Sequence, residues 1–379
     1  MQPNHVSYNS HFPSSSGEYG RDHSPSQQFI PAGAPMQGGY GYSPQQYTFV
    51  PGIGFVRRSP EDDERAQIAR SSRQLAFAMI ACLGLMYLVY PFASLLTSLV
   101  TGLLRIVPSP AASALSSNTI SYVVALSIPF MVYQSRVGIP IKAAYPLKRP
   151  RTWLVLCGTL IFLGVCTIGD AASDMLDTLL RTGGMYARSS NAVMPSDTLG
   201  AVLHVLLYAL LAPILEELVF RGVIMQSLRR FGDALALVCS SVLFALIHAD
   251  ILTLPYAFLS GLVIGYFVLR SGSLLTGMII HFANNLFWII YDAAATGLSP
   301  TQGDIVLHSI YTAFIIAGLF AAVFAAKRDA AMFSLAPGST ALPYKLKIRT
   351  MFTSGLMIVF IIIVLGLMLG NISTSSMPW

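Results

Sequence analysis

The sequence has very few charged residues for its length. Only 11% of its 379 residues are Asp, Glu, Lys or Arg, whereas 54% are hydrophobic. A soluble domain carries about 25% charged residues. This composition therefore argues against a soluble enzyme, a secreted disulfide scaffold and a nucleic-acid-binding protein. The mean hydropathy of +0.63 instead indicates a multi-pass membrane protein.

Cysteine is scarce and shows no pairing pattern. The chain contains no CxxC pair, and the HExxH sequence of many zinc proteases is also absent. Each of the four cysteines lies singly in an apolar run, at Cys82, Cys157, Cys166 and Cys239. We expect them to be small buried side chains rather than disulfides or metal ligands.

The first 56 residues lack the aliphatic pattern of a folded segment. They are rich in Ser, Gly, Pro, Gln and Tyr, as the stretch over residues 40–47 illustrates. Such a segment cannot bury enough surface to offset its ordering entropy, so we predict a disordered tail over residues 1–56. A spacer is its expected role, and a regulatory or phase-forming arm is the alternative. The highly charged residues 57–74 predict a juxtamembrane helix.

Apolar runs long enough to cross ~30 Å of hydrocarbon recur along the rest of the chain. The predicted fold is all-α, a polytopic transmembrane bundle of eight or nine helices. This membrane domain occupies residues 75–370 and is followed by a short C-terminal tail over 371–379. The individual runs are 75–98, 114–134, 153–171, 199–228, 233–249, 253–270, 274–291, 306–326 and 350–370.

Lysine and arginine are distributed unevenly between alternate loops. Short cytoplasmic loops retain positive charge, so this asymmetry predicts a cytoplasmic N-terminus. The tail is similar in composition to those of actinobacterial membrane proteins, and we expect a bacterial plasma membrane as the location. The predicted cytoplasmic side holds the clusters 57–73, 136–151, 221–230 and 327–349 together with Arg270. The opposite side holds only Arg105, Arg181 and Arg188.

A few ionisable residues remain inside the apolar runs, where a charge costs about 2.5 to 3.5 kcal/mol. The fourth run contains Glu216, Glu217 and Arg221. Glu217 and Arg221 are four residues apart and share a helical face, so they can pair. Glu216 points about 100° away and needs another partner. Pro213 cannot donate to the preceding turn, so we expect a kink that frees carbonyls beside the carboxylates.

The fifth and seventh runs add two histidines and an amide. The fifth ends in Phe244 and His248, and the seventh carries His281 and Asn285 on one helical face. At 1.5 Å per residue, the polar groups of all three runs lie about 12 to 22 Å from the cytoplasmic helix ends. This shared depth favours a single polar cavity. Each motif alone has a structural explanation, as an ion pair or a helix–helix hydrogen bond, but packing does not require the whole set.

Three motifs follow one another on these runs: Glu-Glu-x-x-x-Arg, Phe-x-x-x-His and His-x-x-x-Asn. In this order they resemble the CAAX protease and bacteriocin-processing (ABI) family of intramembrane endopeptidases, which includes the Ras-converting prenyl endopeptidase. The resemblance covers roughly residues 195–330. It implies that Glu216 activates the hydrolytic water with His248 beside it. It also implies that His281 and Asn285 stabilise the oxyanion, and that Glu217 and Arg221 form a supporting pair.

The chemistry of these residue types agrees with the implied roles. A carboxylate withdrawn from bulk water is a usable base, and fixed donors in a dry cavity stabilise developing negative charge. We expect no cofactor and hydrolysis without metal. Zinc bound by Glu216, His248 and His281 is the alternative, because two histidines and a carboxylate can complete a site with one open position.

The expected partners are the lipid bilayer and a membrane protein or peptide substrate, with no nucleic acid. A bacterium is not expected to contain prenylated CAAX proteins, so cleavage near the termini of a membrane protein, or of a secreted peptide leader, is the expected reaction. A non-catalytic scaffold of the same fold is one alternative. An ion-coupled transporter is another, disfavoured because no internal repeat is evident and Pro213 is the only helix interruption near the cluster.

Overall fold

The computed structural model describes residues 47–57, 59–188, 194–335 and 341–374. The chain divides into two compact units, Met1–Pro60 and Glu61–Trp379. In the first unit, strands β1 (Tyr47–Val50) and β2 (Gly54–Arg57) pair as an antiparallel hairpin. The predicted disordered tail lies outside the described residues as far as residue 46, and its last part forms this hairpin instead.

The second unit is built from helices, and the predicted all-α membrane fold is confirmed. Among the described residues, seven helices are long and apolar enough to cross a membrane, or eight if α12 and α13 form one bent span. The helices outside residues 198–231 are α1 (Pro60–Leu103), α2 (Pro110–Val137), α3 (Ile141–Ala144), α4 (Thr152–Thr182), α8 (Asp233–Ile247), α9 (Leu254–Ser271), α10 (Leu274–Ala295), α11 (Pro300–Arg328), α12 (Tyr344–Phe352) and α13 (Gly355–Gly370). Short strands β3 (Tyr186–Ala187) and β4 (Ile372–Ser373) pair antiparallel.

The span count falls short of the nine predicted runs because of α8. This helix has 15 residues. It is therefore about 22 Å long at 1.5 Å per residue, which is less than the ~30 Å of a bilayer core. The ninth predicted run is also divided, since α12 and α13 are bent by 67° at their junction.

The predicted juxtamembrane helix and the first span are one continuous helix, α1, of 44 residues. The Ser72 hydroxyl on α1 donates to the Met351 carbonyl and lies 2.6 Å from the Ser354 hydroxyl. Arg230 donates to the Ser71 hydroxyl at 2.8 Å. These bonds hold the first half of α1 against the α12–α13 junction and the end of the helix over residues 198–231.

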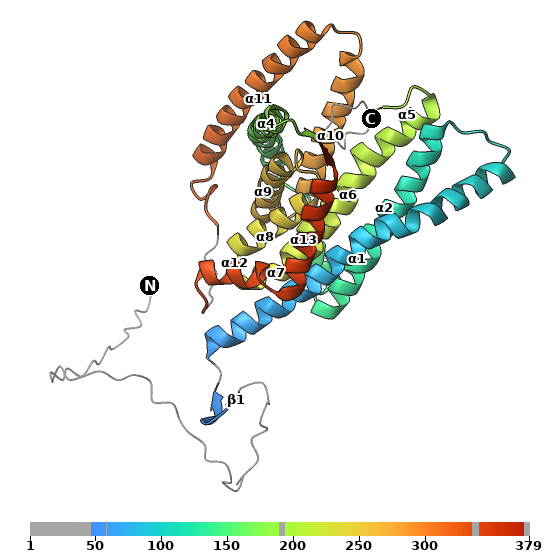
Figure 1. The fold of residues 1–379 in the computed structure, drawn as a ribbon. Helices are drawn as coiled ribbons and strands as arrows, with labels where there is room; N and C mark the ends of the chain where they lie inside the picture. Colours follow the sequence, from blue (N-terminus) through green and yellow to red (C-terminus); the bar gives the residue numbers. More distant parts are fainter. Residues whose placement is uncertain (1–46, 58, 189–193, 336–340, 375–379) are drawn as a thin grey trace, which may run out of the picture. The chain divides into compact units, whose positions relative to one another are not determined.

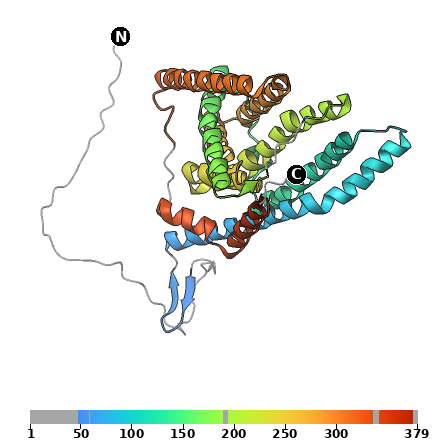
Figure 2. The same ribbon diagram turned by 45° about the horizontal axis from the view of Figure 1, so that its top comes forward.

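Close packing of α4 against α9 and α11 depends on two glycines. A Cβ at Gly164 would lie 2.8 Å from the Phe314 carbonyl oxygen, and one at Gly169 would lie 2.8 Å from Tyr256 Cα. Small residues of this kind let membrane helices approach closely. Figures 1 and 2 show α11 and α1 on opposite sides of α8 and α9. Helix α9 contacts α4, α8 and α10, and α4 in turn contacts α11.

The helix over residues 198–231 becomes π-helical twice. It starts as α5 (Thr198–His204), becomes π-helical over Val205–Leu211, continues as α6 (Ala212–Glu216), is π-helical again over Glu217–Ile224, and ends in α7 (Met225–Leu228) and a 3₁₀ turn. The first π segment ends just before Pro213, whose ring would clash with the carbonyl four residues earlier in a regular α-helix. A wider turn relieves that clash, so the expected irregularity takes the form of a change in winding.

Candidate active site

Glu217 and Arg221 form a buried ion pair in the second π segment. Arg221 Nη1 donates to Glu217 Oε1 at 2.9 Å, and the two side chains are 1% and 0% exposed. Arg221 Nη2 donates to the Gly261 carbonyl on α9 at 3.4 Å. The guanidinium lies 4.3 Å from the centroid of the Phe244 ring on α8, within the range of a cation–π contact. The pairing predicted from the four-residue spacing is present, and it ties three helices together.

His281 of α10 lies between the two carboxylates. Its Nδ1 donates to Glu217 Oε1 at 3.0 Å, because an ionised carboxylate only accepts. Its Nε2 lies 3.6 Å from Glu216 Oε2, which is longer than a direct hydrogen bond. The imidazole of His281 therefore contacts Glu217 directly and faces Glu216 across a longer gap.

Glu216 finds its partner on α2, in a residue that the sequence analysis missed. The Tyr122 hydroxyl donates to Glu216 Oε1. Glu216 thus points away from the Arg221 pair, as its 100° offset from Glu217 predicts. One signal in the sequence was available: tyrosine usually lies near the ends of membrane helices, and one in the middle of an apolar run needs a hydrogen-bond partner.

Gly277 makes room for the Glu217 carboxylate. A Cβ at Gly277 would lie 2.7 Å from Glu217 Oε2 and 2.8 Å from Val268 Cγ2. Gly277 and His281 are four residues apart on α10, so one helical face both admits the carboxylate and bonds it. Within the described part of the chain, Glu217 Oε2 is buried and has no hydrogen-bond partner. Glu217 is therefore held through Oε1 alone.

The substitution Gly277→Ala is expected to destabilise the protein by about 1 to 3 kcal/mol, the usual cost of overpacking. The added methyl meets a carboxylate whose other oxygen is fixed by two partners, so the carboxylate cannot move aside freely. Thermal unfolding in detergent measures the effect. Gly366→Ala on α13 is the matched control, since nothing lies within 4 Å of its Cβ position. Equal stability of Gly277→Ala and wild type would contradict the close contact.

His248 lies beside this cluster at the end of α8. Its Nδ1 donates to the Phe244 carbonyl at 2.7 Å, which leaves Nε2 as the free nitrogen. The Phe244 ring packs against both histidine rings in T-shaped contacts, with centroid separations of 5.0 Å to His248 and 6.0 Å to His281. Among the described residues, His248 makes no hydrogen bond or ion pair with either carboxylate, and it is exposed. The Phe-x-x-x-His motif thus places one aromatic ring in contact with both histidines.

Asn285 is fixed by a short chain of hydrogen bonds that links α9, α10 and the first π segment. The Tyr256 hydroxyl donates to Asn284 Oδ1 at 3.0 Å, and Asn284 Nδ2 donates to Asn285 Oδ1 at 3.0 Å. Asn285 Nδ2 donates to the Tyr208 carbonyl at 2.8 Å. An amide nitrogen carries two hydrogens, so one N–H of Asn285 remains for a ligand. Asn284 and Tyr256 were not predicted as site residues.

The Tyr208 carbonyl is available because of Pro213. In the first π segment, the Ala212 N–H donates to the Leu207 carbonyl, five residues back. The next donor in this register would be residue 213, and proline has no N–H. The Tyr208 carbonyl therefore accepts the Asn285 amide instead. Pro213 thus frees one carbonyl, as expected, and the amide of Asn285 binds it.

The residues proposed as zinc ligands do not gather at one point. In the described ranges, no group of three or more His, Cys, Asp or Glu side chains is placed to hold a metal ion. Glu216 and His281 approach each other, but His248 is turned to its own helix carbonyl. The donor set does not fit a zinc site in this arrangement.

The fold and this cluster define a multi-pass helical membrane protein with a polar site built on its central helices. Residues 198–287 match the model of a family described as type II CAAX prenyl endopeptidase Rce1-like. The match confirms the family resemblance predicted from the three motifs, and the matched segment contains every predicted site residue. Tyr122 lies outside it.

Two curated proteins are similar to parts of the chain. "Putative membrane peptidase YdiL" of Bacillus subtilis (strain 168) is 28% identical over 139 residues, which is 36% of this chain and 55% of that protein. The chain thus spans about half the length of this relative. "Uncharacterized 24.3 kDa protein" of Escherichia coli is 28% identical over 159 residues, covering 40% of this chain and 69% of the other. No solved structure matches the chain.

Proposed function

We propose that the protein is an intramembrane endopeptidase that hydrolyses a peptide bond of a membrane-associated protein or peptide. The observation that carries the proposal is the environment of Glu216. Tyr122 holds one of its oxygens, while the other faces His281 Nε2 at 3.6 Å. A carboxylate with one fixed and one available oxygen is suited to act as a general base. The Rce1-like match, which includes Glu216 and His281, supports this assignment.

The proposed reaction begins when Glu216 Oε2 takes a proton from water as the water oxygen attacks the scissile carbonyl carbon. The carbonyl oxygen becomes an oxyanion, to which His281 Nε2–H and the free N–H of Asn285 donate. Glu216 then returns the proton to the leaving nitrogen as the C–N bond breaks, giving a free carboxyl and a free amine. Glu217 and Arg221 orient His281 through its Nδ1 and do not touch the substrate.

We propose that catalysis needs no metal. The effects of a chelator and of replacing Asn285 test this proposal. Activity should survive a strong zinc chelator. Asn285→Ala should lower kcat about 10² to 10³-fold, because one oxyanion donor is lost. Rate measurements in proteoliposomes and metal analysis of the purified protein check both expectations. Activity that a chelator removes and zinc alone restores would reassign His248 and His281 as ligands.

The proposed location is a bacterial plasma membrane, with the N-terminus in the cytoplasm. The cations at the ends of the helices support this orientation, since Arg136 lies in the last turn of α2 and Arg270 in that of α9. Substrates would be membrane proteins cleaved near their termini, or peptide leaders. A tag at the N-terminus tested for protease accessibility in sealed vesicles would report the orientation directly.

The test of the activity compares wild type and Glu216→Ala, each reconstituted with peptides from a membrane lysate. New peptide termini that form only with the wild type support the endopeptidase. Matching peptide profiles from two folded preparations would instead favour the scaffold or the transporter. Proton or cation uptake by the vesicles then separates these two alternatives.

A further inference from the structure

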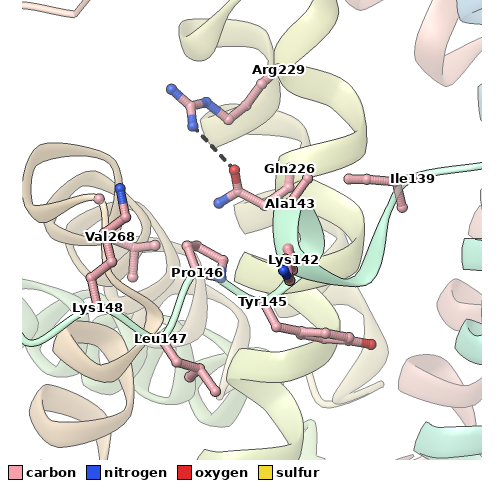
Figure 3. Close-up of a pocket in the computed structure, with 11 residues that line it drawn as sticks. Ile139, Lys142, Ala143, Tyr145, Pro146, Leu147, Lys148, Gln226, Arg229 and Val268 are labelled. Carbon is pink, nitrogen blue, oxygen red and sulfur yellow. Dashed lines mark hydrogen bonds between the residues drawn. The ribbon is translucent and has the colours of Figure 1, made fainter.

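A second polar feature shares no lining residue with the Glu216 cluster: it is a cavity of about 550 Å³ between the α3–α4 connection, α7 and the C-terminal end of α9. Its lining includes Lys142, Lys148, Gln226 and Arg229. In Figure 3, Gln226 and Arg229 line one wall, and the Tyr145–Lys148 segment lies across from them. The cavity is at the end of the helices where cations gather, near the last turns of α2 and α9.

Two lysines of the cavity, Lys142 and Lys148, have no neutralising partner among the described residues. No carboxylate is among its lining residues. The charge of Arg229 is neutralised by Asp233, whose Oδ1 lies 2.7 Å from the Arg229 Nε. Lys142 and Lys148 make no hydrogen bond or ion pair with any described side chain, and both are exposed. The Tyr145 phenol is neutral at pH 7, and burial raises its pKa further, so it adds no negative charge to this wall.

The segment that bears the lysines is held in place. The Leu274 N–H donates to the Pro146 carbonyl at 2.8 Å, and the Ser273 hydroxyl donates to the Lys148 carbonyl. The Tyr145 hydroxyl donates to Gln134 Oε1 at 2.8 Å. These bonds anchor the connection to α10 and α2, so the cavity is formed before any ligand binds and little ordering is needed on binding.

We propose that this cavity binds the phosphate-bearing headgroup of an anionic membrane phospholipid. Lys142 and Lys148 supply the charge. Ile139, Leu147 and Val268 supply an apolar wall beside it, which suits a molecule with a charged head and a hydrocarbon body. Basic pockets at the ends of membrane helices are a common form of lipid recognition. The proposal does not depend on the peptidase activity.

The cavity also adjoins the helix that carries Glu216, Glu217 and Arg221. Gln226 Nε2 donates to the Arg221 carbonyl at 3.1 Å, and its Oε1 accepts from Arg229 Nη1 at 3.1 Å. A headgroup in the cavity would thus lie against the side chains that brace the second π segment. We therefore expect bound lipid to raise the melting temperature of the protein by mass action.

The test uses the full chain in neutral detergent, with a fluorescent phosphatidylglycerol as the probe. Unlabelled phosphatidylglycerol should displace the probe, whereas phosphatidylcholine and inorganic phosphate should not. Lys142→Ala/Lys148→Ala should weaken binding roughly 30-fold, since each cation near an anionic headgroup contributes a factor of about five. Arg149→Ala/Arg151→Ala is the control: it removes the same charge from exposed neighbours outside the cavity, and should change affinity less than twofold.

Three results would overturn the proposal. Equal displacement by phosphatidylcholine would show that the headgroup charge is not recognised. Displacement by inorganic phosphate at lipid-like concentrations would assign the cavity to a soluble anion. Equal loss in both double variants would attribute binding to general surface charge. The first two comparisons use the wild type alone, so they decide the matter even if a variant does not fold.

Discussion

Replacing Glu216 by Gln is expected to lower the rate of peptide hydrolysis about 10² to 10⁴-fold, the usual contribution of a general base. The amide has the shape of the carboxylate and keeps an oxygen that can accept from Tyr122. It cannot take a proton from water, so the chemical step is lost while the contacts remain. Rates are measured in proteoliposomes on a peptide identified by its new termini, and gel filtration reports the folded yield.

Two further variants separate proton transfer from positioning. Tyr122→Phe should cause a smaller loss, about tenfold or less, because it removes one hydrogen bond and leaves the base. Glu217→Gln should lower both activity and stability, because Glu217 Oε1 serves Arg221 and His281 together. Activity of Glu216→Gln within tenfold of the wild type would contradict the assignment of Glu216 as the general base.

The residues of the site that share a helix could be predicted from the sequence. Spacing by four fixes a common face, which is enough to pair Glu217 with Arg221 and to place His281 near Asn285. The position of Tyr122 in an apolar run indicates that it needs a hydrogen-bond partner, but not that the partner is Glu216, because the two residues are 94 apart and meet only through helix packing. The role of Gly277 could not be predicted either, since this residue leaves space for the Glu217 carboxylate rather than making a bond.

The helical spans could be predicted from hydropathy, but their internal geometry could not. Hydropathy measures how apolar a run is and is blind to hydrogen-bond register, so the two π segments over residues 205–224 left no signal beyond Pro213. The apolar run at residues 233–249 likewise gave no sign that its helix would end at Ile247. Ending there places His248 at the turn, where its ring bonds the Phe244 carbonyl.

Arg221→Ala is expected to destabilise the protein by about 3 to 5 kcal/mol, the cost of removing one partner of a buried ion pair. It leaves Glu217 at 0% exposure with a single hydrogen bond, from His281. Glu216→Ala should cost less, because Glu216 is 13% exposed and loses only Tyr122 and the longer contact to His281. Denaturant or thermal unfolding in detergent, with folded yield by gel filtration, measures the difference.

A matched pair elsewhere in the chain provides the control for Arg221. Asp177 and Arg181 are also four residues apart, and Asp177 Oδ2 lies 2.7 Å from Arg181 Nε. Their side chains, however, are 27% and 56% exposed. Arg181→Ala should therefore change stability by only about 0 to 1 kcal/mol. Adding Glu217→Gln to Arg221→Ala should restore part of the lost stability, because it removes the uncompensated charge. If the double variant is less stable than Arg221→Ala alone, the stability lost in Arg221→Ala comes from packing around the guanidinium, including its contact with Phe244. It then does not come from the unpaired carboxylate of Glu217.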